Sequence, residues 1–519
     1  MYGCVLSGTR EIQPVGKGRP SAAKGVRHEA VGVAGWKSDE VVVVMKRANK
    51  VGTTTAESVE RRASAERSPA GITVAGTQRP AESDEGLARV REAAQGNRTL
   101  RFDNLLHHVT LPLLERAYRG LHKDAVPGVD GVDWEVYGEG LGKRLAELHE
   151  AVQTGRYRPR PVRRRWIAKP DGRQRPLGIA CVEDKIVQQA VVWVLESIFE
   201  VDFLGFSYGF RPGRSQHDAL DAVYMAITTR RVGWVLDADI EACFDRIEHA
   251  KLLAVLGRRI ADRRVLHLIE RTLAAGVVDG GTWQPTPVGV PQGAVISPLL
   301  ANVFLHDAID RWVHRWRERQ ARGMVSIVRY ADDFVIGVQY RDDGERLWEG
   351  LGQRLTRYGL TLHPGKTRLL EFGRYAQANR TRRRQGKPET FDFLGFTHCC
   401  AKRRSDGAFA VRRLSIGRRV RAFLQRVKQD LQRRYAWSIA RQGSWLGSVV
   451  RGYFQYHGVP GNDAALQTVR REANRLWLRT LRGRSQRHDM TWKRFTHHVR
   501  RWIPSCKIVH PYPNQRFAF

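Results

Sequence analysis

Two short β-prone runs enclose a pair of adjacent aspartates in the middle of the chain. The first run is Val325–Arg329 and the second is Val335–Val338, with Tyr330–Phe334 (YADDF) between them. Strands this close in sequence usually pair as a hairpin, which would put Asp332 and Asp333 at its turn. Aspartate is also common in ordinary polar turns, so the pair does not identify a site by itself.

A second acidic strand end lies upstream. Trp234–Ile240 is a β-prone run that carries Asp237 and Asp239 on the same predicted face. Beside the hairpin, Asp239 would cluster with Asp332 and Asp333, and such a cluster is unfavourable unless cations neutralise it. Hard divalent cations prefer oxygen ligands, and two Mg²⁺ ions about 3.5–4 Å apart could activate a 3′-hydroxyl and stabilise a leaving pyrophosphate. The pattern therefore predicts a polymerase.

The rest of the chain divides by pattern. Residues 1–95 are rich in Gly, Ala, Ser, Thr and Arg without a sustained period, which is typical of disorder. A basic stretch at 156–175 precedes a predicted helix over 184–200, and short β-rich runs alternate with helical segments over 232–338, as in a mixed α/β domain. Beyond residue 412 the pattern is helical, with one apolar face. That face carries Val420, Phe423, Leu424, Val427 and Leu431.

The charge balance indicates the kind of partner. The 519 residues include 88 Lys and Arg against 53 Asp and Glu, a formal net charge of +35, which a polyanion would offset. Residues 411–510 hold 23 Lys and Arg against 4 Asp and Glu, hence a net charge of +19, interleaved with Trp and Tyr. Cations and aromatic rings at such density fit an RNA-binding surface. No apolar run approaches about 18 residues, so no membrane partner is expected.

Cysteine usage and the N-terminus indicate the compartment. The six cysteines form no C-x-x-C pair, which argues against a zinc module and against a disulfide framework. The N-terminus also lacks the pattern of a signal peptide. These features favour a cytoplasmic protein with reduced thiols, without a zinc-containing endonuclease module.

Several blocks in chain order give the acidic cluster a family context. They are Asp239–Asp245, Val290–Gly293 with Ser297–Asn302, Tyr330–Asp333, Gly359–Thr367 and Phe391–Phe396. From about Arg101 to Phe519 the chain resembles group II intron reverse transcriptases/maturases of the endonuclease-lacking, bacterial type. The resemblance implies an α/β (α+β) right-hand polymerase. Its expected parts are an N-terminal block and fingers over 96–230, a palm over 231–400, and a helical thumb/maturase domain with a short C-terminal nucleic-acid-binding segment over 401–519.

The resemblance also assigns roles to single residues. Asp239, Asp332 and Asp333 would be the catalytic residues and the ligands of two Mg²⁺ ions, for which Mn²⁺ can substitute, whereas Asp237 is outside the family motif. Phe244 would crowd the 2′ position of the incoming sugar and so favour dNTPs over NTPs. The other expected nucleotide-binding residues are Lys169 and Arg175, on a predicted fingers hairpin over 166–177, then Gln292, and Lys366 as an acid toward pyrophosphate. The expected RNA- or template-binding residues are Arg211, Arg419, Arg426, Lys428 and Arg451.

The implied function is an RNA-directed DNA polymerase that copies intron RNA and also binds it as a splicing maturase in group II intron mobility. Its partners would be the group II intron RNA, an RNA template, a DNA primer or target, and dNTPs, within a cytoplasmic ribonucleoprotein of unknown oligomeric state. Three alternatives stay open at this point. They are a related bacterial reverse transcriptase with a defence or retron-like role, an RNA-binding maturase without polymerase activity, and an RNA-dependent RNA polymerase. The complete aspartate set argues against the second, and Phe244 against the third.

Overall fold

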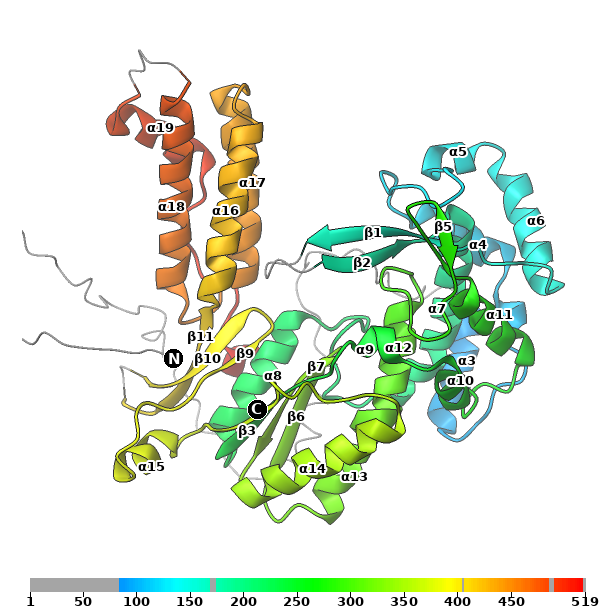
Figure 1. Ribbon diagram of the computed structural model, residues 1–519, viewed down its shortest axis with the longest axis horizontal. Coiled ribbons are helices and arrows are strands. Elements are labelled where there is room, and N and C mark those ends of the chain that lie inside the picture. Colours follow the sequence, from blue (N-terminus) through cyan, green and yellow to red (C-terminus); the bar gives the residue numbers. More distant parts are fainter. Residues whose placement is uncertain (1–83, 169–173, 404–405, 485–489, 517–519) are drawn as a thin grey trace, which may run out of the picture.

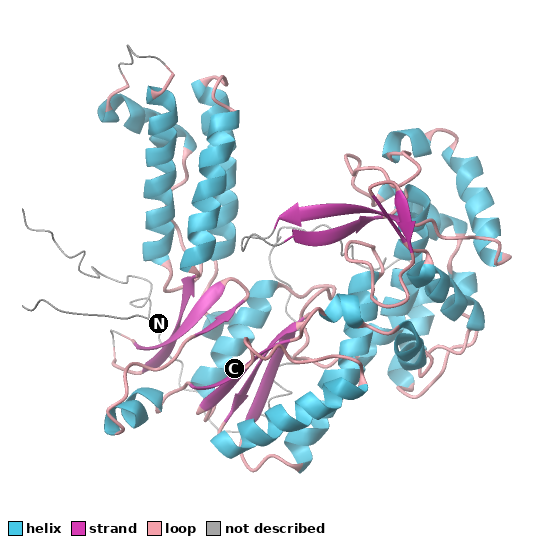
Figure 2. Ribbon diagram, viewed as in Figure 1, coloured by secondary structure: helices cyan, strands magenta, loops and turns pink. Residues whose placement is uncertain are grey.

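The computed structural model describes residues 84–168, 174–403, 406–484 and 490–516. A block of helices with a projecting hairpin, a central sheet and a bundle of long helices make up the molecule (Figures 1 and 2). The resemblance predicts that these parts are the fingers, palm and thumb of a right-hand polymerase, and these names are used for them below. The predicted class, mixed α/β with a helical C-terminal region, is confirmed.

The central sheet contains the predicted hairpin. Its strands lie in the order β6 (Val325–Tyr330), β7 (Asp333–Val338), β3 (Trp234–Asp239) and β8 (Arg368–Glu371), and all neighbours are antiparallel. The pairing of β6 with β7 confirms the hairpin, and β3 confirms the upstream strand. These strands are rich in Val and Ile because such side chains suit a buried pleated surface.

Helices cover both faces of this sheet (Figure 1). One face, which includes Leu236, packs with Leu347 of α14 (Arg341–Arg357) in the largest core cluster. The other face packs against α8 (Gln216–Thr229) in a second cluster. The remaining palm helices are α9 (Cys243–Arg246), α12 (Ser297–Leu305), the π-helix η2 (His306–Asp310) and α13 (Arg311–Arg319).

A second sheet forms the fingers. Its strand order is β2–β1–β4–β5, and β1 (Val162–Ala168) pairs antiparallel with β2 (Gln174–Ile179) as predicted. This hairpin projects toward the thumb (Figure 1). Helix α7 (Val182–Asp202) is buried on nearly all sides, which confirms the helix predicted over 184–200. The other elements here are η1 (Leu106–His108), α4 (Leu111–Arg119), α5 (Trp134–Gly138), α6 (Leu141–Gln153), α10 (His249–Leu256), α11 (Arg263–Ala274), β4 (Val277–Asp279) and β5 (Thr282–Gln284).

The boundaries of the expected parts need three corrections. Residues 85–95 were expected to be disordered, but they belong to helix α3 (Glu85–Gly96), which is capped by Asp84 and buries Leu87 and Val90. Strands β4 and β5 come from the expected palm but complete the fingers sheet, because β4 pairs with β1. Helix α8 comes from the expected fingers but packs on the palm sheet. Residues 1–83 lie outside the described residues.

In the described part of the chain, four helices form the thumb bundle, namely α16 (Gly417–Arg433), α17 (Ile439–His457), α18 (Asp463–Arg482) and α19 (Trp492–Trp502). Val427 and Leu431 of the predicted apolar face are buried in its core. A three-stranded sheet joins the bundle to the palm; its strands are β9 (Phe391–Phe393), β10 (Phe396–Lys402) and β11 (Phe409–Ser415), preceded by α15 (Ala376–Arg382). Among the helices that the structure describes, none has the length and apolarity needed to cross a bilayer.

The chain returns from the thumb to the palm along a C-terminal strap, residues 503–516. The strap ends in α20 (Pro513–Arg516), whose Arg516 forms ion pairs with Asp218 and Asp221 of α8. One Asp221 oxygen lies 3.0 Å from Arg516, and the other lies 2.5 Å from Arg413, at the base of the thumb. Both ends of the thumb are therefore bound to the same carboxylate.

We expect the contact between strap and palm to weaken in acid. His510 stacks on His217 with 3.6 Å between ring centroids, and the carbonyl of Tyr456 lies 2.8 Å from His217 Nε2. Burial, followed by His510, lowers the pKa of His217 to about 4, with Arg413 and Arg516 acting in the same direction. Because its folded-state pKa lies below the ordinary value, His217 contributes stability that is complete above about pH 6.5 and lost as the pH falls toward 4.

This contribution amounts to at most about 3 kcal/mol of the free energy of unfolding. Thermal unfolding measured from pH 7 to pH 4 should show it as a falling melting temperature. His217→Gln keeps a side-chain donor for the Tyr456 carbonyl but does not titrate. Its melting temperature should therefore fall less between pH 7 and pH 4 than that of the parent chain. An unchanged pH profile in His217→Gln would contradict the assignment.

Candidate active site

The three predicted aspartates lie at one end of the palm sheet. Asp239 ends β3 and Asp333 begins β7, and the two are directly paired in the antiparallel register. Asp332 precedes Asp333 in the turn, next to Ala331, whose φ is +57°. A non-glycine residue rarely adopts this left-handed conformation, and such residues are frequent at functional sites.

Negative charge accumulates at this end of the sheet. Burial raises the pKa of Asp333 to about 8, and Asp332, Asp237 and Asp239 add to that rise by repulsion. Burial also raises the pKa of Asp332, as does repulsion by Asp239, while Arg175 opposes the shift. A bound cation would relieve both effects.

Carboxylate oxygens are suitable ligands for Mg²⁺ or Mn²⁺, so the donor set fits divalent ions of this kind. Among the described residues, however, no three or more His, Cys, Asp or Glu side chains already converge as a complete metal site. Asp239 is instead paired with Lys366, whose Nζ lies 2.5 Å from Asp239 Oδ2. Lys366 would have to move for Asp239 to turn toward a metal ion.

Asp237 has a different partner from its neighbour. Arg368 of the adjacent strand β8 donates a 3.1 Å hydrogen bond to Asp237 Oδ2. Burial raises the pKa of Asp237, and this bond with Arg368 works against the rise. Asp237 is thus paired within the sheet, as Asp239 is paired with Lys366, and the omission of Asp237 from the ligand set stays a prediction.

A chain of side-chain contacts connects the fingers hairpin to the palm. Arg175 Nε donates to Gln292 Oε1 at 2.7 Å, and Gln292 Nε2 donates to Asp245 Oδ1 at 3.0 Å. Gln292 and Asp245 also line a pocket of about 310 Å³ between the fingers sheet and the 285–292 loop. The structure thus brings Arg175 and Gln292 together. Lys169 lies outside the described residues.

Phe244 sits beside this chain of contacts. It belongs to α9, is 9% exposed and packs into the palm core, and its carbonyl accepts a 2.7 Å hydrogen bond from the Val290 N–H. Its role in sugar discrimination stays a prediction. The sequence did not single out Asp245 as a functional residue, although the block Asp239–Asp245 contains it.

Gln292→Ala should loosen the Arg175 guanidinium, because the glutamine amide is what holds its Nε. We expect the dNTP KM to rise by about tenfold, which corresponds to about 1.4 kcal/mol, with little change in melting temperature. The matched control is Gln284→Ala, which replaces an exposed glutamine on β5 of the fingers sheet. Steady-state primer extension would check both variants. An unchanged KM in Gln292→Ala would show that the contact has no role in nucleotide binding.

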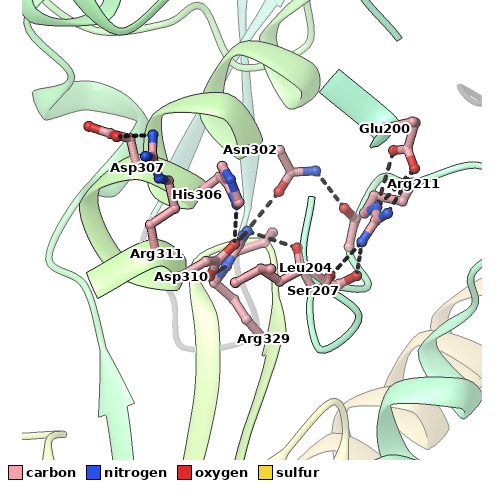
Figure 3. Close-up of polar contacts among 12 residues, drawn as sticks. Glu200, Leu204, Ser207, Arg211, Asn302, His306, Asp307, Asp310, Arg311 and Arg329 are labelled. Atoms are coloured by element: carbon pink, nitrogen blue, oxygen red, sulfur yellow. Dashed lines mark hydrogen bonds and ion pairs between the residues drawn. The ribbon is translucent and has the colours of Figure 1, made fainter. Parts of the chain in front are cut away.

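The structure contradicts the prediction for Arg211, which was expected to contact a template phosphate. Its side chain is 4% exposed and pairs with Glu200, and one of its Nη atoms donates to the carbonyls of Leu204 and Ser207, each at 2.8 Å (Figure 3). The guanidinium is therefore occupied inside the protein. Arg211 holds the 204–209 loop in place instead.

A second buried arginine lies below the turn that carries Asp332 and Asp333. Arg329 is 0% exposed and forms an ion pair with Asp310, which is also 0% exposed (Figure 3). Its remaining N–H groups reach Asn302, Ser207 and the carbonyl of Ala331. The sequence carried one signal for this site, since a charged residue within the apolar run Val325–Arg329 needs a buried partner.

The thumb presents the predicted cations to solvent. Arg419, Arg426, Lys428 and Arg451 are exposed, and none has an ion-pair partner within the described ranges. Arg419 and Arg426 are seven residues apart and share one flank of α16, while Lys428 lies on the opposite flank.

The aromatic residues of the thumb differ in burial. Trp477 is fully buried, whereas Trp437 and Trp445 are half-buried and stack with Arg434.

The chain is similar in sequence to a known protein family and to several known proteins. Residues 167–398 match the family model of the reverse transcriptase (RNA-dependent DNA polymerase). Protein YkfC of Escherichia coli is 37% identical over 277 residues, which cover 46% of this chain and 72% of YkfC. Group II intron-encoded protein LtrA of Lactococcus lactis is 34% identical over 229 residues, 44% of this chain and 38% of LtrA. Nuclear intron maturase 2 of Arabidopsis thaliana is 26% identical over 233 residues, 37% of this chain and 30% of that protein. The chain thus spans well under half of these last two relatives.

Proposed function

The chain belongs to the reverse transcriptase family, among the group II intron-encoded reverse transcriptases/maturases, and from this premise we propose that it copies intron RNA into DNA. The observation that carries the proposal is the pairing of Asp239 with Asp333, beside Asp332, at the end of the palm sheet. The similarity to LtrA and to intron maturases favours this function over a defence role or a retron-like role.

In this proposal Asp239, Asp332 and Asp333 hold two Mg²⁺ ions, for which Mn²⁺ can substitute. Bound there, the ions would lower the pKa of the primer 3′-hydroxyl and neutralise charge on the leaving pyrophosphate. The 3′-hydroxyl loses its proton to solvent water, the 3′-oxygen forms a bond to the α-phosphorus of the dNTP, and the bond between the α-phosphorus and the bridging oxygen to the β-phosphate breaks. Pyrophosphate leaves with the electron pair of that bond.

The chain's own side chains would do the rest. Arg175, oriented by Gln292, would clamp the triphosphate, since a guanidinium can bind phosphate oxygens in pairs. Phe244 would exclude a 2′-hydroxyl by steric contact. Lys366 Nζ, 2.5 Å from Asp239 in the structure, would turn to the pyrophosphate and donate a proton to it.

Extension of a DNA primer annealed to an RNA template, with the full chain, tests this proposal. We expect product with Mg²⁺ and dNTPs, and little with NTPs alone. Phe244→Ala should gain NTP incorporation without losing dNTP incorporation. Absence of extension by the parent chain, or preference for NTPs, would overturn the proposal.

The maturase role would depend on the basic thumb, which we propose binds intron RNA in a cytoplasmic ribonucleoprotein. If the thumb neutralises about 8 phosphates, the logarithm of the binding constant should fall with the logarithm of salt concentration at a slope near −6. Replacing Arg419, Arg426 and Lys428 with glutamine should make this slope shallower by about 2.

Matched controls come from arginines outside the helical bundle that already pair with acids, of which Arg322 and Arg341 are exposed and Arg403 is half-buried. Arg322, Arg341 and Arg403 have partners at 2.9, 2.8 and 2.6 Å, and their glutamine variants should leave the salt slope unchanged. Filter binding of intron RNA at several salt concentrations would measure both sets. Equal effects in the two sets would contradict a specific role for the thumb.

A further inference from the structure

The turn that carries Asp332 and Asp333 is held in an unusual backbone conformation. Ala331 precedes the two aspartates with φ +57°, a region that alanine rarely occupies without support from its surroundings. Asp332 follows directly, so the direction of its carboxylate depends on how Ala331 is held. The supporting contacts come from below the turn, in the protein interior.

The first support is the guanidinium of Arg329. Its Nη1 donates to the Ala331 carbonyl at 2.9 Å and to Asn302 Oδ1 at 3.0 Å. Its other donors reach Asp310 Oδ1 at 2.7 Å, Asp310 Oδ2 at 2.5 Å and Ser207 Oγ at 2.8 Å. All five N–H groups of the guanidinium are therefore used, which fixes its position.

The second support is the backbone of Gly209. This glycine packs so closely under the turn that a Cβ atom there would lie 2.3 Å from the Ala331 nitrogen. The 206–209 loop is aligned with β6, since the Tyr208 N–H donates to the Arg329 carbonyl at 2.8 Å and the Arg329 N–H donates to the Phe206 carbonyl at 2.9 Å. The missing side chain of Gly209 therefore allows the Ala331 backbone to pack directly against it, and any larger residue would displace the turn.

One side chain links these two supports. Asn302, 1% exposed on α12, accepts from Arg329 through Oδ1 and donates through Nδ2 to the Gly209 carbonyl at 2.6 Å (Figure 3). Both halves of its carboxamide are in use, one for each support. Helix α12 continues into η2, which supplies Asp310, so one helical segment provides acceptors on both sides of the guanidinium.

We propose that Asn302 is a positioning residue for the catalytic turn, fixing Arg329 against Gly209 so that Ala331 presents Asp332 and Asp333 in one orientation. Asn302 touches neither aspartate. It acts through the two groups that hold Ala331. The inference deepens the proposed polymerase function and rests on it.

Asn302→Ala tests this role, with Asn462→Ala as a matched control. Asn462 is a fully buried asparagine at the base of the thumb, whose Oδ1 accepts from the Ser415 N–H at 3.0 Å and whose Nδ2 donates to the His457 carbonyl at 2.8 Å. Each replacement removes a buried carboxamide of equal size, so similar losses in melting temperature are expected. Only Asn302→Ala should disturb the catalytic turn.

Two measurements separate positioning from stability. In single-turnover primer extension at saturating dNTP, Asn302→Ala should slow the reaction by about 10²-fold, and it should need more Mg²⁺ for half-maximal rate, with the dNTP KM unchanged. Hydrogen exchange of peptides that cover residues 329–335 should speed up in Asn302→Ala and not in Asn462→Ala. This second readout does not depend on activity, so an inactive parent chain would overturn the proposed function while exchange still tests the turn.

Unchanged exchange in the turn of Asn302→Ala would overturn the inference, as would an equal loss of rate in Asn462→Ala. If Asn302→Ala does not fold, Gly209→Ala provides the second test, because it pushes on Ala331 and keeps the asparagine. We expect the same loss of rate and the same faster exchange. Parent-like extension by Gly209→Ala would overturn the inference.

Discussion

Asp332→Asn is expected to lower the rate of primer extension by about 10³-fold or more while leaving the protein at least as stable to heat as the parent chain. The loss of rate corresponds to about 4 kcal/mol, in the range that metal-bound charge stabilisation supplies. Stability should hold because burial and mutual repulsion raise the pKa of both Asp332 and Asp333. A neutral amide removes one of the repelling charges and keeps the shape of the side chain.

Two aspartate variants serve as comparisons for this result. Asp342→Asn changes an acid on α14 that is 67% exposed, and it should leave both rate and melting temperature unchanged. Asp237→Asn should lose less rate than Asp332→Asn because Asp237 is engaged with Arg368. Primer extension and thermal unfolding, measured on the same preparations, would check all three. An equal loss of rate in Asp237→Asn would place Asp237 among the metal ligands, and an active Asp332→Asn would refute the mechanism.

Arg329→Met should destabilise the palm by about 3–5 kcal/mol, the usual cost of leaving a buried charge without its partner. Asp310 would lose the guanidinium that pairs with both of its oxygens, and both side chains are 0% exposed. Burial alone would raise the pKa of Asp310, but Arg329 and His306 outweigh it and hold this pKa below its ordinary value. The pair's contribution is thus complete above about pH 4 and lost only as the pH falls through the lower folded-state pKa.

Chemical denaturation would measure this loss, and two further variants test its cause. The double variant Arg329→Met/Asp310→Leu should recover much of the stability but not the activity, because the Ala331 carbonyl still lacks its donor. Arg413→Met should cost less than Arg329→Met, since Asp221 would keep Arg516 at 3.0 Å. Equal losses of stability in Arg329→Met and Arg413→Met would contradict the supporting role of Arg516 at Asp221.

The local features of the palm could be predicted from the sequence because they depend on neighbouring residues. The hairpin of β6 and β7 follows from two apolar runs around a polar turn, and the strand that ends in Asp239 follows from a third. The pairing of Asp239 with Asp333 spans 94 positions, and these aspartates were expected together because the resemblance assigns both to one metal site and because a carboxylate cluster suits a common cation.

The remaining features depend on contacts that sequence patterns do not carry. Arg211 lies in a loop rich in glycine and aromatic residues and was expected at the surface, but Glu200 and two carbonyls of that loop enclose it. Strand β4 joins the fingers sheet through a parallel pairing with β1, more than 100 residues upstream. Trp477 belongs to a segment dense in cations, and it is nevertheless part of the thumb core. In each case the tertiary partner decides the role.

Arg413 and Arg516 both form ion pairs with Asp221, and this arrangement has a mechanical consequence. The chain enters the thumb just after Arg413 and returns from it at Arg516, and both arginines pair with the carboxylate of Asp221 in the palm. A pull on the thumb by a bound nucleic acid would therefore reach α8 through these two ion pairs, in addition to the three-stranded sheet that also joins the thumb to the palm. That helix packs Leu220 and Val223 against Val328 of β6, the strand that leads into the turn with Asp332 and Asp333. Tension along the RNA and the alignment of the reacting groups are thus connected by a few side chains.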